Sequence, residues 1–309
     1  MVPSVPHVPP KYKHMFVYVS VEPFGYRGIP RDGFAEGATM PRAHFIHRVF
    51  VDWNAVPHDS FARSIPALAS LPLDLTSNVT FFTGENCSGK STLLEAMAVA
   101  YGLNPEGGSR NYHFATNDTH GSLHEATHLM RSSDHPWGAY FLRAESFYNV
   151  ATAAEGYESR YLGPHADELL SGAHLSTGTT LGQARQLLGR SLHELSHGEA
   201  FLATIQEDFH ENGLYFLDEP EAALSLSRQL TLLYELYQLA QHGAQLIVAT
   251  HSPIVLALPG AQILRFDEEG IDEITYEETE AYQTMSLFMA DYQQLLARLL
   301  DEQAEQNHH

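Results

Sequence analysis

A glycine-bounded loop from Gly84 to Ser91 holds the residues whose types and spacing best suit chemistry, because its letters GENCSGKS fit the pattern G-x-x-x-x-G-K-[ST]. Backbone N–H groups of residues 85–91 would surround the β- and γ-phosphates of a nucleotide, and the following helix would turn its positive dipole end toward the same charge. Lys90 would add a point charge, and Ser91 a magnesium ligand. An ordinary tight turn before a helix is the alternative, although a chance match to the pattern is rare in a chain with three lysines. The predicted nucleotide-binding residues are Gly84, Glu85, Asn86, Cys87, Ser88, Gly89, Lys90, Ser91 and Thr92.

Two acids end an apolar run later in the chain, in the stretch GLYFLDEPE from Gly213 to Glu221. Such a run predicts a buried strand that delivers Asp218 and Glu219 to the edge of a sheet. Asp218 would hold magnesium through water, and Glu219 would polarise a water for in-line attack on the γ-phosphate. An acidic loop after a strand is common, so it is the presence of the phosphate loop that favours the catalytic interpretation.

Two shorter motifs are consistent with the same chemistry. The stretch LSHGE, residues 195–199, directly precedes a helical pattern, and its Ser and Gly could form a second anion-binding site with Ser196 as the N-cap. A plain capping sequence is the alternative. His251 follows the apolar run 246–249, and a histidine at such a place is usually structural. LSHGE and His251 indicate a function only together with the phosphate loop and the two acids, Asp218 and Glu219.

Taken in order, the phosphate loop, LSHGE, FLDEPE, AALS and a histidine after a strand resemble the motifs of the ATP-binding cassette (ABC) ATPases, including their SMC and RecF-like branch. The stretches GENCSGKSTLLEAMA, FLRAESFYNVA, SLHELSHGEAF, GLYFLDEPEAALS and ATHSPIVLA look more like a compact group of bacterial predicted ATPases. The resemblance covers roughly residues 40–275. It implies an enzyme that binds ATP and Mg²⁺ and hydrolyses ATP, with DNA-related and defence processes among its candidate roles.

The resemblance also implies a homodimer in which two copies sandwich two nucleotides, so that neither active site is complete in a monomer. Ser196, Gly198 and Glu199 would form the signature motif that reaches the γ-phosphate held by the other copy. His251 falls at the position of the switch histidine, which contacts the γ-phosphate and the attacking water. Residues 223–225 would cross the dimer interface.

The sequence departs from the family pattern at several positions. Cys87 stands where the family usually has Gly, and its thiol could make the loop sensitive to oxidation or be a harmless substitution. His197 replaces a Gly of the transporter motif. The expected Q-loop glutamine is missing, and Glu145 is the best positional match, either as a magnesium ligand or as a simple helix-start acid. The aromatic residue that would stack on adenine is not assigned; the candidates are Tyr18, Phe24, Tyr26 and Trp53.

A competing motif is HEATH, which spans His124 to His128 and matches the H-E-x-x-H zinc motif of metalloproteases. Two histidines on one helix turn would hold zinc, Glu125 would be the general base, and His120 extends the spacing. The chain contains 19 histidines, so a chance match is common, and the segment lacks an apolar helix face and an evident third ligand. Zinc proteolysis is therefore a remote alternative.

The elements that must position these residues alternate between strand and helix patterns, which predicts a mostly parallel sheet with ligands at the carboxyl ends of its strands. The expected strands are His14–Val21, Phe45–Trp53, Val79–Thr83, Gly138–Arg143, Leu214–Leu217, Gln245–Ala249 and Gln262–Phe266, and the expected helices are Ser91–Tyr101, Ala144–Ala154, residues 198–210 and Ser225–His242. Residues 66–76 and 103–136 are interpreted as loop and edge segments.

The predicted fold is an α/β P-loop NTPase of the ABC type, with a mostly parallel central sheet, an N-terminal antiparallel β part and a small helical lobe. The expected divisions are a flexible N-terminus at 1–13, a nucleotide-binding core at 14–110 and 198–275, an accessory lobe with the signature motif at 111–197, and an acidic C-terminal helix and tail at 276–309. That last segment could be a solvated surface helix or a partner-binding tail.

Composition restricts the partners. A net charge of −21 disfavours DNA and anionic membranes unless Arg27, Arg31, Arg42 and Arg48 gather on one face. The single cysteine, the lack of a signal peptide and the absence of an 18-residue apolar run predict a soluble cytoplasmic protein without a transmembrane segment. A free-standing ATP-driven switch with a protein partner is favoured, because the lobe is too short for an SMC coiled coil. The alternative is the ATP-binding subunit of an ABC transporter, which would need a membrane partner.

Overall fold

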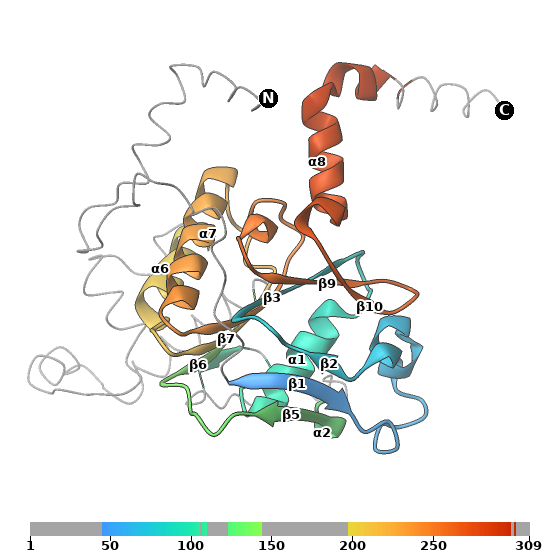
Figure 1. Cartoon of the computed structure of the whole chain (residues 1–309), viewed down its shortest axis with the longest axis vertical. Coiled ribbons are helices and arrows are strands. Elements are labelled where there is room, and N and C mark those ends of the chain that lie inside the picture. Colours follow the sequence, from blue (N-terminus) through green and yellow to red (C-terminus); the bar gives the residue numbers. More distant parts are fainter. Residues whose placement is uncertain (1–44, 106, 110–122, 144–196, 298–299, 301–309) are drawn as a thin grey trace, which may run out of the picture.

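The computed structural model describes residues 45–105, 107–109, 123–143, 197–297 and 300 (Figure 1). Several predictions fall outside these residues: the strand at 14–21, the helix at 144–154, and the roles of Glu145 and Ser196. The other predicted strands and helices are all present, and their ends agree to within two residues.

A seven-stranded sheet forms the centre, with the strand order β10-β9-β3-β8-β7-β6-β4. Neighbouring strands from β9 to β6 are parallel, and only the two edge strands, β10 and β4, run antiparallel. The strands are β3 (Val79–Gly84), β4 (Gly108–Ser109), β6 (Ala139–Arg143), β7 (Leu214–Asp218), β8 (Gln245–Ala249), β9 (Gln262–Phe266) and β10 (Ile271–Ile274). Every residue of β7 and β8 is buried, which explains their continuous apolar sequences.

Helices cover both faces of this sheet (Figure 1). Helix α1 (Lys90–Tyr101) covers one face, whereas α6 (His197–Asp208) and α7 (Leu226–Gln241) cover the other. Successive side chains of a strand point to opposite faces. Accordingly, Phe82 packs in the core cluster of α1, and its neighbour Phe81 packs in that of α6 and α7.

A second sheet, antiparallel and three-stranded, has the order β2-β1-β5 and packs on the α1 side (Figure 1). It consists of β1 (Ile46–Val51), β2 (Leu73–Asp74) and β5 (Thr127–Arg131). The predicted antiparallel β part is therefore present. Two of its strands lie in segments that were interpreted as loop or edge, because β2 has only two residues and β5 reads THLMR, without the apolar alternation of a strand.

The buried side chain of Gln245 joins the two sheets. Its Oε1 accepts hydrogen bonds from the backbone N–H groups of Phe45 at 2.9 Å and Ile46 at 2.8 Å, and its Nε2 donates to the carbonyl of Ile46 at 2.8 Å. Gln245 is fully buried at the start of β8. One side chain thus forms hydrogen bonds with three backbone groups at the start of β1 that would otherwise be buried without partners.

Strands β5 and β6 lie within residues 111–197, the segment predicted as an accessory lobe. The structure pairs β5 with β1 in the three-stranded sheet and β6 with β7 in the central sheet. The boundaries between the domains stay predictions.

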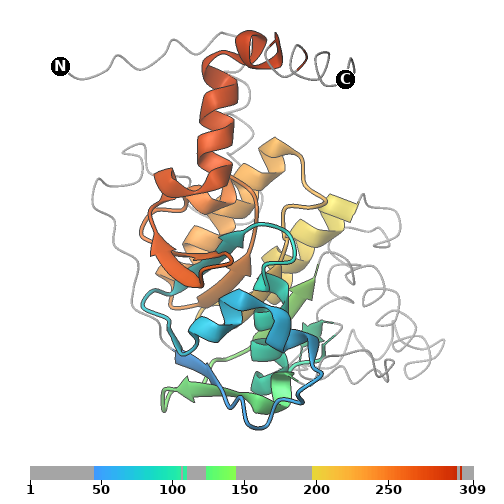
Figure 2. The ribbon, with the colours of Figure 1, turned by 90° about the vertical axis from the view of Figure 1, so that its right-hand side faces the viewer.

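The C-terminal helix α8 (Glu280–Ala290) follows a short 3₁₀ helix, η7 (Tyr276–Glu278), and projects away from both sheets in two perpendicular views (Figure 1 and Figure 2). A helix in this segment was predicted. Within the described ranges, no helix is long and apolar enough to cross a membrane.

Candidate nucleotide-binding site

Two glycines allow the loop between β3 and α1 to form. Gly84 has φ +134°, and a Cβ there would lie 2.1 Å from the carbonyl oxygen of Phe266 on β9. Gly89 has φ +102°, and a Cβ there would lie 2.6 Å from Cγ2 of Ile65. Any side chain at either position would collide with the neighbouring strand or loop, so the phosphate-loop pattern is a steric requirement in this fold.

Cys87 also has a left-handed backbone, with φ +65°, and it is exposed. A residue with a Cβ pays a conformational cost of about 1 kcal/mol in this region, whereas Gly pays little. The resemblance placed Gly at this position, and the backbone angle supplies a physical reason for that preference.

Lys90 begins α1, and its side chain turns back across the loop. Its Nζ donates hydrogen bonds to the carbonyl oxygens of Gly84 at 2.9 Å and Glu85 at 2.5 Å. Burial lowers the pKa of Lys90, and the carboxylates of Glu219 and Asp218 act in the opposite direction. A buried cation beside the loop is suited to hold phosphate oxygens.

Ser91 and Asp218, the predicted magnesium ligands, are in direct contact. The Ser91 hydroxyl of α1 donates to Oδ1 of Asp218 at the end of β7, at 2.8 Å. Mg²⁺ prefers hard oxygen ligands and usually takes one or two from the protein, the rest coming from water and substrate phosphates. A hydroxyl and a carboxylate at hydrogen-bonding distance fit this requirement.

Arg143, at the end of β6, extends this cluster and was not among the predicted site residues. Its Nη1 bonds to Oε2 of Glu95 at 2.8 Å, and its Nε lies 3.6 Å from Oδ2 of Asp218. Nε is buried and has no hydrogen-bond partner in the part of the chain that the structure describes. Arg143 stands in the RAESF stretch, but nothing in that pattern indicated an ion pair with the acid at the end of β7.

Glu219, the predicted general base, has a left-handed backbone with φ +49°. Its N–H still donates to the carbonyl of Ala249 on β8, at 2.9 Å. Its carboxylate acts electrostatically on both Lys90 and His251. The chain therefore turns sharply at the carboxyl end of β7, close to the phosphate-loop lysine and the predicted switch histidine.

His251 follows β8 and has a half-buried side chain. Its ring Nε2 is buried and has no hydrogen-bond partner among the described residues. Burial, and then the charge of Lys90, lower the pKa of the ring. Both effects favour the neutral form of the ring, and its Nε2 can still accept a ligand's hydrogen bond or donate to a ligand.

Glu221 holds the backbone next to this histidine. Its Oε1 accepts hydrogen bonds from the N–H groups of His251 and Ser252, and burial raises its pKa. The hydroxyl of Ser252 donates to Oε1 of Gln229 on α7, at 2.7 Å. The DEPE and THSP loops are therefore tied together, and the sequence reasoning had given Glu221 no role.

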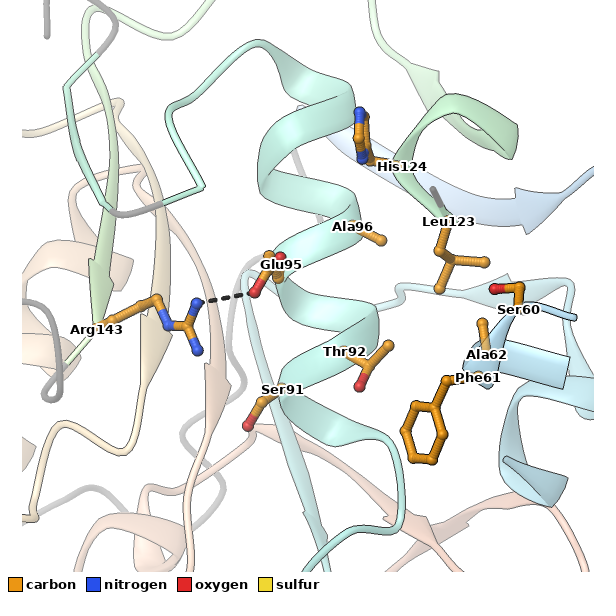
Figure 3. A pocket seen from close by; sticks show the side chains of 10 residues that line it. All are labelled: Ser60, Phe61, Ala62, Ser91, Thr92, Glu95, Ala96, Leu123, His124 and Arg143. Atoms are coloured by element: carbon orange, nitrogen blue, oxygen red, sulfur yellow. Dashed lines mark hydrogen bonds and ion pairs between the residues drawn. The ribbon is translucent and has the colours of Figure 1, made fainter. Parts of the chain in front are cut away.

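A cavity of about 460 Å³ opens along α1 beside the phosphate loop (Figure 3). Ser91, Thr92 and Arg143 line it together with Phe61 of the 3₁₀ helix Phe61–Ser64. The ring of Phe61 is 70% exposed. Of the four predicted adenine-stacking candidates only Trp53 is described, and it packs against the core with Arg63 over its ring. Phe61, which the sequence reasoning missed, is the exposed aromatic side chain in this cavity.

The HEATH stretch does not form a zinc motif. Helix α2 (Leu123–Ala126) ends inside it, and Thr127 begins β5. His124 and His128 therefore lie on different elements, and His128 stacks on Phe50 with ring centroids 5.1 Å apart. The expectation that both histidines share one helix turn is wrong. The described ranges contain no group of three His, Cys, Asp or Glu residues that could hold a metal.

Of the predicted signature residues, Gly198 and Glu199 lie in the first turn of α6, which begins at His197. Ser196 directly precedes the described helix. The contribution of this motif to a second copy's site stays a prediction.

Two family models match the chain. One, described as "AAA domain", matches residues 62–134, which include the phosphate loop and α1. The other, described as "AAA domain, putative AbiEii toxin, Type IV TA system", matches residues 188–257, which include α6, β7, α7 and β8. No curated protein matches the chain significantly.

Two similar solved structures come from ABC transporters. An inward-facing putative metal-chelate type ABC transporter shares 19% identity over 69% of this chain and 79% of its own, with a TM-score of 0.38. The ADP conformation of an ATP-binding cassette of an ABC transporter shares 18% identity over 76% of this chain and 92% of its own, with a TM-score of 0.43. Both TM-scores are below 0.5, so neither likeness indicates what this chain does.

The two AAA-domain matches divide the site between them: one contains Lys90 and Ser91, and the other Asp218, Glu219 and His251. These residues come together around one glycine-bounded loop at the carboxyl edge of a parallel sheet. Over residues 62–134 and 188–257 the chain is therefore similar to AAA-domain proteins, and these two segments carry its phosphate loop and the acids and histidine that face it.

Proposed function

We propose that this protein hydrolyses ATP at the site around Lys90, Ser91 and Asp218. The observation that carries the proposal is the 2.8 Å hydrogen bond between Ser91 and Asp218, which are 127 residues apart in sequence. It brings the phosphate loop and the acid at the end of β7 to one point. Ser91 and Asp218 would hold Mg²⁺, which would neutralise the charge of the phosphates.

Each side chain then has a distinct task. Lys90 exchanges its contacts with the loop carbonyls for phosphate oxygens. Glu219 takes a proton from water as the water oxygen attacks the γ-phosphorus, and the bond to the β–γ bridging oxygen breaks so that ADP leaves. His251 donates from its unpartnered ring nitrogen to a γ-phosphate oxygen, and Phe61 stacks on the adenine.

The proposed active unit is a sandwich of two copies, each supplying its signature residues, Ser196 and Gly198, to the γ-phosphate bound by the other. ATP binding would then close the dimer and hydrolysis would open it, so that the protein works as an ATP-driven switch. The net charge of −21 favours a protein partner over DNA.

Glu219→Gln tests this proposal. The amide cannot accept the proton, so we expect turnover to fall at least about a thousandfold while the variant with ATP and Mg²⁺ forms a trapped dimer. Turnover is measured as phosphate release, and mass by light scattering with and without ATP. The matched control is Glu268→Gln, at an exposed acid beyond β9, which should leave both readouts unchanged. Residual turnover near the wild-type rate would exclude Glu219 as the base, and a variant without an ATP-induced dimer would exclude the sandwich.

A further inference from the structure

Helix α8 and the helical residues after it expose a concentration of apolar side chains. Seven of the thirteen large apolar side chains exposed in the described residues lie here: Met285, Leu287, Phe288, Met289, Tyr292, Leu296 and Leu300. Every residue from Gln283 to Gln294 is exposed. Monomeric soluble proteins rarely expose so many large apolar side chains on one short segment. In both views the helix projects away from the sheets (Figure 1 and Figure 2).

The start of the helix is firmly anchored. Thr279 is fully buried, and its hydroxyl accepts from the N–H of Tyr282, which caps the first turn of α8. The hydroxyl of Tyr276 donates to the carbonyl of Pro253 in the loop that carries His251, at 2.7 Å. The anchor fixes where α8 leaves the core, so the exposed side chains are presented in a defined direction.

The helix needs a covering surface for its own stability. It has 11 residues, and isolated helices shorter than about 12–15 residues are marginal in water. In proteins, helices gain most of their stability by packing an apolar face. Beyond Tyr282, the side chains of α8 are exposed and gain little from such packing within the described part of this chain.

Charge favours a second copy of the same chain as the covering surface. The 17 residues from Ala281 to Ala297 contain one charged residue, Asp291, in a chain of net charge −21. Two copies repel one another over most surfaces, and α8 is a stretch where they can meet with little like-charge repulsion. The same net charge disfavours an anionic membrane as the occupant.

The size of the segment also fits. A stable interface of standard size uses roughly 20–30 residues from each partner, and the described residues 280–297 and 300 offer up to 19 from one copy. An isologous contact places the same patch on both sides and needs only self-complementarity. The exposed Met, Leu, Phe and Tyr side chains of this segment are flanked by neutral Gln, Ser and Thr, so two copies of the segment can pack against each other without burying a row of like charges.

We propose that α8 pairs with α8 of a second copy and holds two chains together without nucleotide. This pairing is separate from the ATP-dependent sandwich. By keeping two copies together, it would raise the effective concentration of each nucleotide site for the other and so promote closure on ATP.

The test is the mass of the full chain without nucleotide, measured by sedimentation across a concentration series. We expect a dimer in the wild type, and Met285→Glu combined with Met289→Glu should weaken it at least about a hundredfold, because these two residues, four apart, lie on one face of α8 and two charges would be buried at the contact. The matched control is Trp137→Glu, at an exposed aromatic residue before β6, which should leave the dimer unchanged. A monomeric wild type at about 100 µM, or a dimer that survives the double substitution, would overturn the proposal.

Cross-linking provides a second readout that does not depend on affinity. In a Cys87→Ser background, Met289→Cys should form an oxidised cross-link between copies without ATP, and Trp137→Cys should not. Equal cross-linking at both positions would count against the pairing. Circular dichroism and thermal unfolding of each variant establish that the core is folded. The ATP-induced dimer of Glu219→Gln is measured separately. The nucleotide-free pairing through α8 and the ATP-dependent sandwich can therefore be refuted independently of each other.

Discussion

Glu221 Oε1 accepts a hydrogen bond from the backbone N–H of His251 at 2.7 Å, which links the acidic loop after β7 to the histidine loop after β8. The same oxygen accepts from the N–H of Ser252 at 3.1 Å. The position of the predicted switch histidine therefore depends on a carboxylate 30 residues away.

Glu221→Ala should disrupt this arrangement. Two backbone N–H groups lose their acceptor, which should lower the free energy of unfolding by about 2 kcal/mol and kcat at least about tenfold, with a smaller effect on the KM for ATP. Glu221→Gln keeps one carbonyl acceptor and should retain much of the activity. Urea unfolding and steady-state kinetics measure both effects. If Ala and Gln were equally active, Glu221 would have no positioning role.

The ring of His251 should titrate below its ordinary pKa of 6.5, because burial and Lys90 both disfavour its charged form. The unfolded chain then binds a proton more readily, so the stability contributed by the neutral ring is full above about pH 6.5 and is lost as pH falls toward the folded pKa. Proton NMR of the full chain measures the pKa directly, with His251→Gln to assign the signal. Glu280→Gln should lower the pKa further, since Glu280 acts to raise it. A His251 pKa above 6.5 would contradict the expectation.

Phe61→Ala should raise the KM for ATP about tenfold while kcat stays within about twofold, because base stacking on an aromatic ring contributes roughly 1–3 kcal/mol to binding. Phe61→Tyr preserves the ring and should restore the affinity. Trp137→Ala is a control at another exposed aromatic residue. Fluorescent ATP-analogue titrations check binding independently of turnover, and an unchanged KM would remove Phe61 from the site.

Substitutions at Cys87 should follow its left-handed backbone. Cys87→Gly should stabilise the protein by about 0.5 kcal/mol, since relief of the backbone strain slightly exceeds the added entropy of the unfolded chain. Cys87→Val should destabilise it by about 1–2 kcal/mol, because a β-branched side chain tolerates positive φ poorly. Cys87→Ala retains the strain and serves as the reference in thermal unfolding. If Cys87→Val were more stable than Cys87→Gly, backbone strain at this position would not determine the change in stability.

Gln245→Ala should lower the free energy of unfolding by about 3 kcal/mol, because it leaves the N–H groups of Phe45 and Ile46 and the carbonyl of Ile46 without partners. Asn54→Ala, at an exposed position outside α8, should change it by less than about 0.5 kcal/mol. Urea unfolding monitored by tryptophan fluorescence compares the two variants. Equal stability would mean that the three hydrogen bonds do not hold the sheets together.

The buried strands, the glycine-bounded loop and the end of α1 could be predicted from the sequence, because each depends on residues that are close together in the chain. Continuous apolar runs such as Leu214–Leu217 predicted the buried parallel strands, because a strand covered on both faces needs no polar alternation. The glycines at 84 and 89 marked a loop that tolerates no Cβ, and Gly102 marked the end of α1, where the backbone is left-handed. The phosphate loop, the acids after β7 and the histidine after β8 were therefore predicted at the correct edge of the sheet.

Only the tertiary structure decided which distant groups meet. The Ser91–Asp218 bond, the Arg143–Asp218 ion pair and the Glu221–His251 bond join residues that no local spacing relates. The HEATH letters fit a helix, but pairing of β5 with β1 drew Thr127 and His128 into a strand. An exposed helix within residues 276–309 was expected from the acids of that segment, but α8 exposes apolar side chains, and no local pattern states what covers them. Sequence thus determined the strands, the helices and the glycine-bounded loop through steric and apolar rules that act over a few residues, whereas long-range packing determined the partners of each side chain.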